Sequence, residues 1–229
     1  MSLLQKAVER SKAQKTPLVC TIAGEAGTGK TSLAATFPNP FFVMVEDGLR
    51  SLEEKPDATK VPTVEFFWQI MEALIEEDHE YKTIVIDSVT KLEDMFIQHV
   101  IETDPKKPKS INQAAGGYGA GMAAVGAMHL RLRKACEAIK NKKGCHIVFI
   151  AHANVENLDL PDMDPYMRYS VRLSKNSIAP YRDDVDVVGF VRQQIFLQGD
   201  DDDRIKKAVS TEGREFVCVL EARSIAKNR

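Results

Sequence analysis

The sequence contains Gly24-Glu25-Ala26-Gly27-Thr28-Gly29-Lys30-Thr31, which fits the phosphate-binding pattern G-x-x-x-x-G-K-[ST] at every fixed position. An apolar run at residues 18–23 precedes this stretch and predicts a buried strand. Residues 32–37 follow it and predict a helix that ends before Pro38. Glycines between a strand and a helix let consecutive backbone N–H groups turn toward an anion. The stretch therefore predicts a site for a nucleoside triphosphate, and we expect ATP.

The polar residues of this stretch have expected roles in binding and catalysis. Lys30 reaches the β- and γ-phosphates, and the Thr31 hydroxyl occupies one position on Mg²⁺. Ser32 extends the nucleotide-binding set by one residue beyond the motif. We therefore expect ATP and Mg²⁺ as cofactors, with the nucleotide bound by residues 24–32.

Length and composition are those of an ordinary globular domain. The chain has 229 residues, of which 44% are hydrophobic and 28% charged, enough for one sizeable core. Its net charge of −2 means that any binding of nucleic acid must come from local patches rather than from overall basicity. No apolar run approaches the ~18 residues of a membrane span, and the four cysteines show no C-x-x-C pairing. We expect buried thiols in a cytoplasmic protein, in the bacterial host cytoplasm if a phage encodes it, without a membrane partner.

Three further apolar runs, at residues 41–45, 83–86 and 146–151, predict buried strands between helices. Continuous apolar strands of this kind predict an α/β fold with a mainly parallel central sheet covered by helices on both faces. Ligands of such sheets bind at the carboxyl ends of the strands. The polar residues that follow the three runs are therefore candidates for the site: Glu46 and Asp47, Asp87, and His152.

Each of these strand ends suggests a role. Asp87 is expected to hold Mg²⁺ through water, opposite Thr31. Because Ser88 and not a glutamate follows Asp87, the base that activates water must come from another strand. Glu46 is the first candidate and Asp47 the second, although Glu46 could instead cap a turn. His152 is expected to sense the γ-phosphate, with a turn cap as the alternative.

Residues 103–121 form a long stretch without regular periodicity. It carries Lys106, Lys107 and Lys109, followed by four glycines around Tyr118. Cations for phosphates and a ring for base stacking suit single-stranded nucleic acid. The alternative is a solvated loop, since loops of this length are often functional but not always.

Residues 155–183 are expected to form a second irregular region. Its later part places Arg168, Arg172 and Lys175 among tyrosines, again a composition typical of single-strand binding. Because the region follows His152 directly, we expect its state to depend on the nucleotide. Residues 185–197 and 216–220 predict the last strands.

The order of these parts resembles the ATPase core of the RecA family. Residues 42–49, with Glu46, are similar to the strand that supplies the family's water-activating acid, and residues 85–89 to its Mg²⁺ strand with the Asp-Ser pair. Residues 149–152 are similar to the sensor strand, although the family usually has Gln where this chain has His152. The terminal Lys227-Asn228-Arg229 resembles the K-N-R motif of the RadA branch, which implies that Lys227 and Arg229 reach a neighbour's nucleotide.

In detail the chain looks most like the compact phage nucleotide-binding ATPases associated with single-strand annealing and recombination. The resemblance implies a RecA-like P-loop core at residues 17–229, with antiparallel strands at its C-terminal end. Residues 1–16 would be an N-terminal arm that either frays or packs on another subunit. The implied partners are single-stranded DNA, further copies of the chain in a ring or filament, and a single-strand DNA-binding protein.

Two other functional classes remain open at this point. A P-loop small-molecule kinase would use Arg168 and Arg172 as lid residues. A binding factor switched by ATP would hydrolyse it little. The leading hypothesis is an ATPase stimulated by single-stranded DNA.

Overall fold

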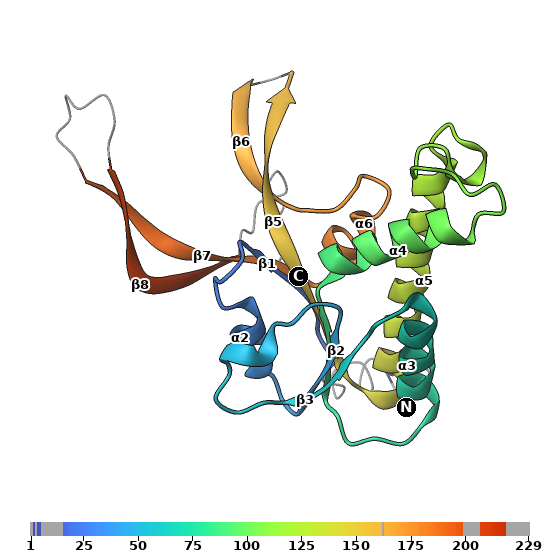
Figure 1. Cartoon of the computed structure of the whole chain (residues 1–229). Helices are drawn as coiled ribbons and strands as arrows, with labels where there is room; N and C mark the ends of the chain where they lie inside the picture. The colour runs from blue at the N-terminus through green and yellow to red at the C-terminus, as the bar shows by residue number, and fades with distance from the viewer. Residues whose placement is uncertain (1, 3, 6–15, 162, 199–206, 219–229) are drawn as a thin grey trace.

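The computed structural model describes residues 2, 4–5, 16–161, 163–198 and 207–218 (Figure 1). The expected N-terminal arm at residues 1–16 lies almost entirely outside this set. Lys227 and Arg229 lie outside it too, so their predicted role in a neighbouring subunit stays a prediction.

A largely parallel sheet forms the middle of the molecule. Its strand order is β3-β2-β4-β5-β1-β7-β8, and along this order the strands run parallel except for β8, which is antiparallel to β7. The predicted α/β class, with a mainly parallel sheet and antiparallel strands at the C-terminal end, is confirmed. The bounds are β1 (Val19–Gly24), β2 (Pro40–Met44), β3 (Asp57–Lys60), β4 (Thr83–Asp87), β5 (His146–Leu160), β7 (Val187–Gln198) and β8 (Lys207–Cys218).

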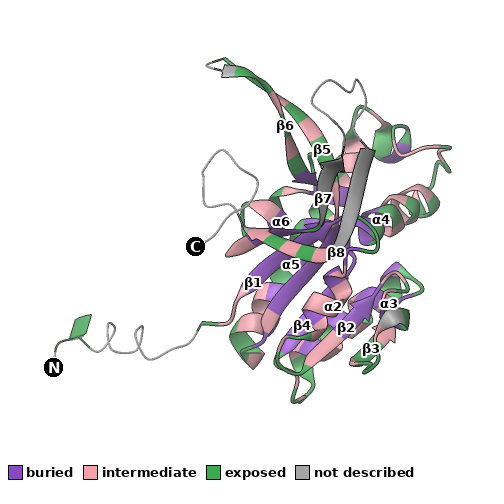
Figure 2. Cartoon of the chain, turned by 90° about the vertical axis from the view of Figure 1, so that its left-hand side faces the viewer, coloured by how far each residue is buried: buried purple, intermediate pink, exposed green. Residues whose placement is uncertain are grey.

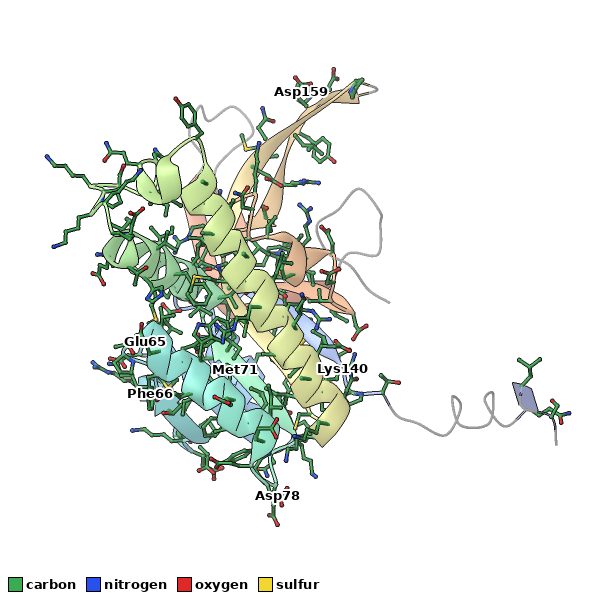
Figure 3. The ribbon with its side chains drawn as sticks, turned by 90° about the vertical axis from the view of Figure 1, so that its right-hand side faces the viewer. Glu65, Phe66, Met71, Asp78, Lys140 and Asp159 are labelled. Carbon is green, nitrogen blue, oxygen red and sulfur yellow. The ribbon has the colours of Figure 1, made fainter. Side chains whose placement is uncertain are left out.

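Helices cover both faces of the sheet. Two hydrophobic cores result, one under the larger helices α3, α4 and α5 and one under the short helix α2. Figure 2 shows the buried strands enclosed between these layers, and Figure 3 shows α3 beside α5. None of the described helices is long and apolar enough to cross a membrane. The helices are α2 (Lys30–Ala35), α3 (Val64–Glu76), α4 (Val89–Thr103), α5 (Ala120–Lys143) and α6 (Ala179–Arg182), with 3-10 turns η1 (Leu49–Ser51) and η2 (Ala114–Gly116).

Local sequence signals set the ends of the long helices. The Thr63 hydroxyl accepts a hydrogen bond from the backbone N–H of Phe66 at the start of α3. Ser88 caps α4 in the same way. Gly144 ends α5 in the left-handed conformation, at φ 70°. A side-chain acceptor at the first position and glycine after the last are the usual signals for these boundaries.

The expectation of an irregular region over residues 155–183 was wrong. Strand β5 continues to Leu160 and pairs with the antiparallel strand β6 (Met163–Val171), so a β-hairpin leaves the sheet. Figure 3 shows Asp159 at the far end of this hairpin, away from Asp78 on the opposite side of the molecule. Among the charged residues of this region, Glu156 and Arg168 are directly opposite each other on the two strands.

Strand β3 was not predicted at all. Its sequence, Asp-Ala-Thr-Lys, contains no apolar run, because the strand lies at the edge of the sheet and is largely exposed. Edge strands with charged side chains are common and hard to recognise from pattern alone.

Tyr181, one of the tyrosines of the region 155–183, is completely buried. Its hydroxyl lies 2.6 Å from Nδ1 of His129 on α5, and its carbonyl accepts a hydrogen bond from the Thr21 hydroxyl on β1. Burial lowers the pKa of His129 to about 3, so the ring is neutral. His129 is therefore a core residue on the buried side of α5.

Replacing Tyr181 with Phe should lower the free energy of unfolding by about 1–3 kcal/mol, because it leaves a buried histidine nitrogen without its partner. Urea unfolding would measure the loss. Tyr118→Phe, at a fully exposed position, is the control and should change stability by less than about 0.5 kcal/mol. Equal stability of both variants would show that the buried hydrogen bond contributes nothing.

Candidate functional site

A pocket of about 530 Å³ opens at the carboxyl ends of the parallel strands. Its size is within the usual range for small ligands. The walls come from the glycine loop after β1 and the start of α2, from the segment after β2, and from the strands β4, β5 and β8. The pocket therefore lies at the edge of the sheet where the sequence analysis expected the site. The described residues that line it are Ala26, Gly27, Gly29, Lys30, Thr31, Ser32, Glu46, Asp47, Gly48, Asp87, His152 and Arg214.

The glycine loop has the backbone conformation that its glycines allow. Gly27 and Gly29 have φ angles of 77° and 90°, in the left-handed region that residues with a Cβ rarely adopt. The loop is closed by the Thr28 hydroxyl and by the Lys30 ammonium, which donate to the carbonyl of Glu25 over 2.9 and 2.7 Å. Lys30 is 7% exposed, and burial lowers its pKa. An anion in the pocket would therefore find this cation already in the loop that surrounds it.

Thr31 and Asp87 lie together as the predicted Mg²⁺ site requires. The Thr31 hydroxyl donates a hydrogen bond of 2.8 Å to Asp87 Oδ2, which leaves the lone pairs of the hydroxyl oxygen to bind a cation. Asp87 is only 1% exposed, and burial raises its pKa to about 6. A hydroxyl beside a carboxylate suits Mg²⁺, which takes oxygen ligands and keeps several waters. The residues present thus fit the ion, with Asp87 holding one of its waters.

Gly48 is a site residue that the sequence analysis missed. A methyl group built on Gly48 would lie 2.7 Å from Asp87 Oδ2 and 2.9 Å from Thr31 Oγ1. Only glycine therefore leaves room beside this pair of oxygens. Gly48 follows the acidic pair Glu46-Asp47 after β2, but its approach to Asp87 depends on β2 and β4 being neighbours in the sheet.

The two candidate bases after β2 have different surroundings. Glu46 Oε1 lies 3.2 Å from Nε2 of His152, and this hydrogen bond is the largest cause that lowers the pKa of Glu46. Its carboxylate is thus ionised and partly buried at the pocket wall. Asp47 instead pairs with Lys60 at 2.9 Å and with Arg50 at 3.0 Å. Glu46 is thus the carboxylate that contacts His152 at the pocket wall, and its role as the base stays a prediction.

His152 also connects the pocket to its surroundings through its backbone. Its N–H donates to the Thr90 hydroxyl on α4, and its carbonyl accepts from the N–H of Arg172 over 2.8 Å. The charge of Arg172 contributes, after burial, to the lowered pKa of Lys30. Arg172, expected to bind nucleic acid, therefore lies close to the phosphate loop.

The other nucleic-acid candidates lie outside the pocket. Lys106, Lys107, Lys109 and Tyr118 are exposed in the segment between α4 and α5, at the same end of the molecule as the β5–β6 hairpin (Figure 1). Asp104 holds this segment in a compact fold by accepting hydrogen bonds from the backbone N–H groups of Lys106 and Ala115.

Two candidates lie on or next to β6. Arg168 is paired with Glu156 across the hairpin at 2.9 Å, whereas Lys175, beyond the end of the strand, is exposed.

A family model described as an AAA domain matches residues 16–229. The chain belongs to this AAA domain family. No curated protein matches the chain. Membership supports a P-loop ATPase that binds a nucleotide, usually with Mg²⁺, and hydrolyses it. The closer resemblance of this AAA domain to RecA-like phage proteins, and of its last residues to the RadA motif, stays a prediction.

Replacing Lys30 with Ala should weaken ATP binding by about 10- to 100-fold, because it removes a charge-assisted hydrogen bond to the phosphates. Isothermal titration with ATP and Mg²⁺ would measure the change. Lys91→Ala is the matched control, because Lys91 is an exposed lysine paired with Asp94 on α4. Undiminished affinity in Lys30→Ala would contradict the assignment of this pocket to the phosphates.

Proposed function

We propose that this AAA domain protein hydrolyses ATP on single-stranded DNA, as a ring or filament of identical subunits, in phage-type recombination or strand annealing. The observation that carries the proposal is the course of β5. Its first part ends at the pocket wall with His152, and its continuation forms a projecting hairpin (Figure 1). The β-strand β5 thus joins the nucleotide pocket to the surface that we assign to DNA.

Hydrolysis would use residues of three strand ends. Lys30 neutralises the phosphates, Glu46 orients and deprotonates the attacking water, and His152 hydrogen-bonds the γ-phosphate. The bond between His152 and Glu46 supports this division: a phosphate that engages the imidazole competes with the carboxylate for it. The presence of the γ-phosphate would then alter both the base and the strand that leads into the hairpin.

The DNA surface would combine two segments at one end of the molecule. The loop between α4 and α5 offers Lys106, Lys107 and Lys109 for phosphates, with Tyr118 for stacking on a base. The hairpin offers Arg168, and Lys175 follows it. Exposed cations beside an exposed aromatic ring are the composition of surfaces that bind single strands without sequence preference.

The first test is ATP hydrolysis by the purified chain, with and without single-stranded DNA, over a series of protein dilutions. Stimulation by DNA, with activity per subunit falling on dilution, would support an assembled ATPase completed by a neighbouring subunit. Turnover indifferent to both DNA and dilution would contradict the proposal and direct attention to phosphate acceptors of a kinase.

Glu46→Gln should lower kcat for ATP by about 10²- to 10⁴-fold, the usual contribution of general-base catalysis. The affinity for ATP should change little, because the amide keeps the shape of the side chain. Asp47→Asn is the matched control and should retain turnover, since Asp47 is paired with Lys60 and Arg50. If Asp47→Asn rather than Glu46→Gln lost activity, Asp47 would be the base.

Replacing Lys106, Lys107 and Lys109 together with Ala should weaken binding of single-stranded DNA without sequence preference. Each lost phosphate contact flattens the dependence of log K on log salt by about 0.7, so the slope should fall by ~2. Fluorescence anisotropy at several salt concentrations measures both effects. The charge-matched control removes Lys134, Lys140 and Lys142 toward the other end of α5, where Figure 3 places Lys140. An equal loss in both triple variants would contradict a specific role for the loop.

A further inference from the structure

Arg214 on β8 extends over the phosphate loop of its own chain. A methyl group built on Gly29 would lie 2.5 Å from Nη1 of Arg214, and the guanidinium group lines the pocket. Gly29 directly precedes Lys30. The charged side chains of Lys30 and Arg214, which are far apart in the sequence, therefore both lie at the phosphate loop. The sequence analysis gave no indication of this, because the residue lies about 180 positions after the motif and is flanked by no recognisable pattern.

The sheet register explains how β8 reaches the loop. Strand β1 ends at Gly24, which is opposite Val191 of β7, and the chain then turns into the glycine loop. Strand β7 continues past this point, and Arg214 on β8 is opposite Gln193, two residues beyond Val191. The β7–β8 hairpin therefore starts beside the strand that carries the phosphate loop and passes next to it.

The hairpin places its charges differently on its two faces. Arg192 and Glu215 are directly opposite each other and form an ion pair of 3.1 Å. Arg214 directly precedes Glu215 in β8. Because successive side chains of a strand point to opposite faces, the side chain of Arg214 lies on the other face, toward the loop. Among the described residues, no ion pair of Arg214 with a carboxylate is found. A guanidinium in this position is available to an anion bound in the loop.

The position of Arg214 also indicates which part of a nucleotide it would meet. In the sheet, β5 lies on one side of β1 and β7 on the other. The groups assigned to the γ-phosphate and to Mg²⁺ come from the side of β5, on β2, β4 and β5 itself, whereas Arg214 comes from the side of β7. A polyphosphate chain with its γ-end near Glu46 and His152 would extend its α-end toward Arg214.

We propose that Arg214 binds the α- and β-phosphates of the nucleotide in cis, as a second cation of the phosphate site beside Lys30. Its planar guanidinium can form two parallel hydrogen bonds to phosphate oxygens, which a lysine cannot. The proposal rests on nucleotide binding at the glycine loop and is independent of DNA. It makes the β7–β8 hairpin a part of the nucleotide site.

The test compares Arg214→Gln with Arg192→Gln, an arginine on the opposite face of the same hairpin. Binding of ATP, ADP and inorganic pyrophosphate, each with Mg²⁺, is measured by titration calorimetry. Arg214→Gln should weaken all three by about 10-fold or more, the value of a charge-assisted hydrogen bond, and Arg192→Gln should leave all three unchanged. Arg214→Lys should recover part of the affinity, because it restores the charge without the planar pair of donors.

Other patterns would overturn the proposal. Loss of ATP affinity alone would place Arg214 at the γ-phosphate, and loss for nucleotides but not for pyrophosphate would place it at the base or ribose. Unchanged affinities in Arg214→Gln, together with a loss in Lys30→Ala, would reject Arg214 while keeping the site. If the wild-type chain bound none of the three, the phosphate site itself would be rejected, and this proposal with it.

Discussion

Parallel pairing of β1, β5, β4 and β2 is the constraint on which the site depends. Because the strands run in one direction, their carboxyl ends meet at one edge, where Gly24 is opposite His152 and Asp87 is opposite Met44. Residues separated by more than 100 positions in the sequence are thereby brought around one pocket. Asp87 ends β4 and His152 lies within β5, so both are positioned by buried strands rather than by loops.

The stability needed to hold these polar groups comes from the same strands. In β4, Ile84 and Ile86 enter the core under the larger helices, Val85 enters the core under α2, and all three are fully buried. Each such side chain contributes about 1.5–3 kcal/mol of transfer free energy. Asp87, the next residue, is buried at a cost that appears in its raised pKa. The burial of three apolar side chains in β4 thus offsets the free-energy cost of burying the Asp87 carboxylate.

The lowered pKa of Lys30 and the raised pKa of Asp87 have the same largest cause, burial. Desolvation disfavours the charged form of each group, and the opposite charge of the other group favours it only in part. A bound nucleotide with its metal ion would supply the missing opposite charges at both points. The arrangement is therefore better suited to the site with its ligands than to the protein alone, which is typical of functional sites.

Much of this site could be read from the sequence, because its residues adjoin strong local patterns. The glycine loop, Asp87, Glu46 and His152 each follow a continuous apolar run, and such runs identify buried strands without knowledge of the fold. The hairpin β5–β6 and strand β3 were missed because exposed strands lack that signal. Gly48 and Arg214 were missed for another reason: their roles depend on which strands are neighbours in space, and strand order is not contained in any local pattern.

The strand order also explains why two hairpins leave the sheet beside the pocket. β5 and β7 are the two neighbours of β1, and each continues past the end of β1 and returns through an antiparallel partner. The hairpins diverge (Figure 1), but near their bases Tyr169 of β6 stacks on Phe190 of β7 with ring centroids 5.7 Å apart. An aromatic pair contributes only about 0.5–1.5 kcal/mol beyond its buried area, less than the several kcal/mol of a tightly bound ligand. The contact thus joins the two hairpins close to the strand that carries the phosphate loop, between the hairpin that follows His152 and the hairpin that carries Arg214.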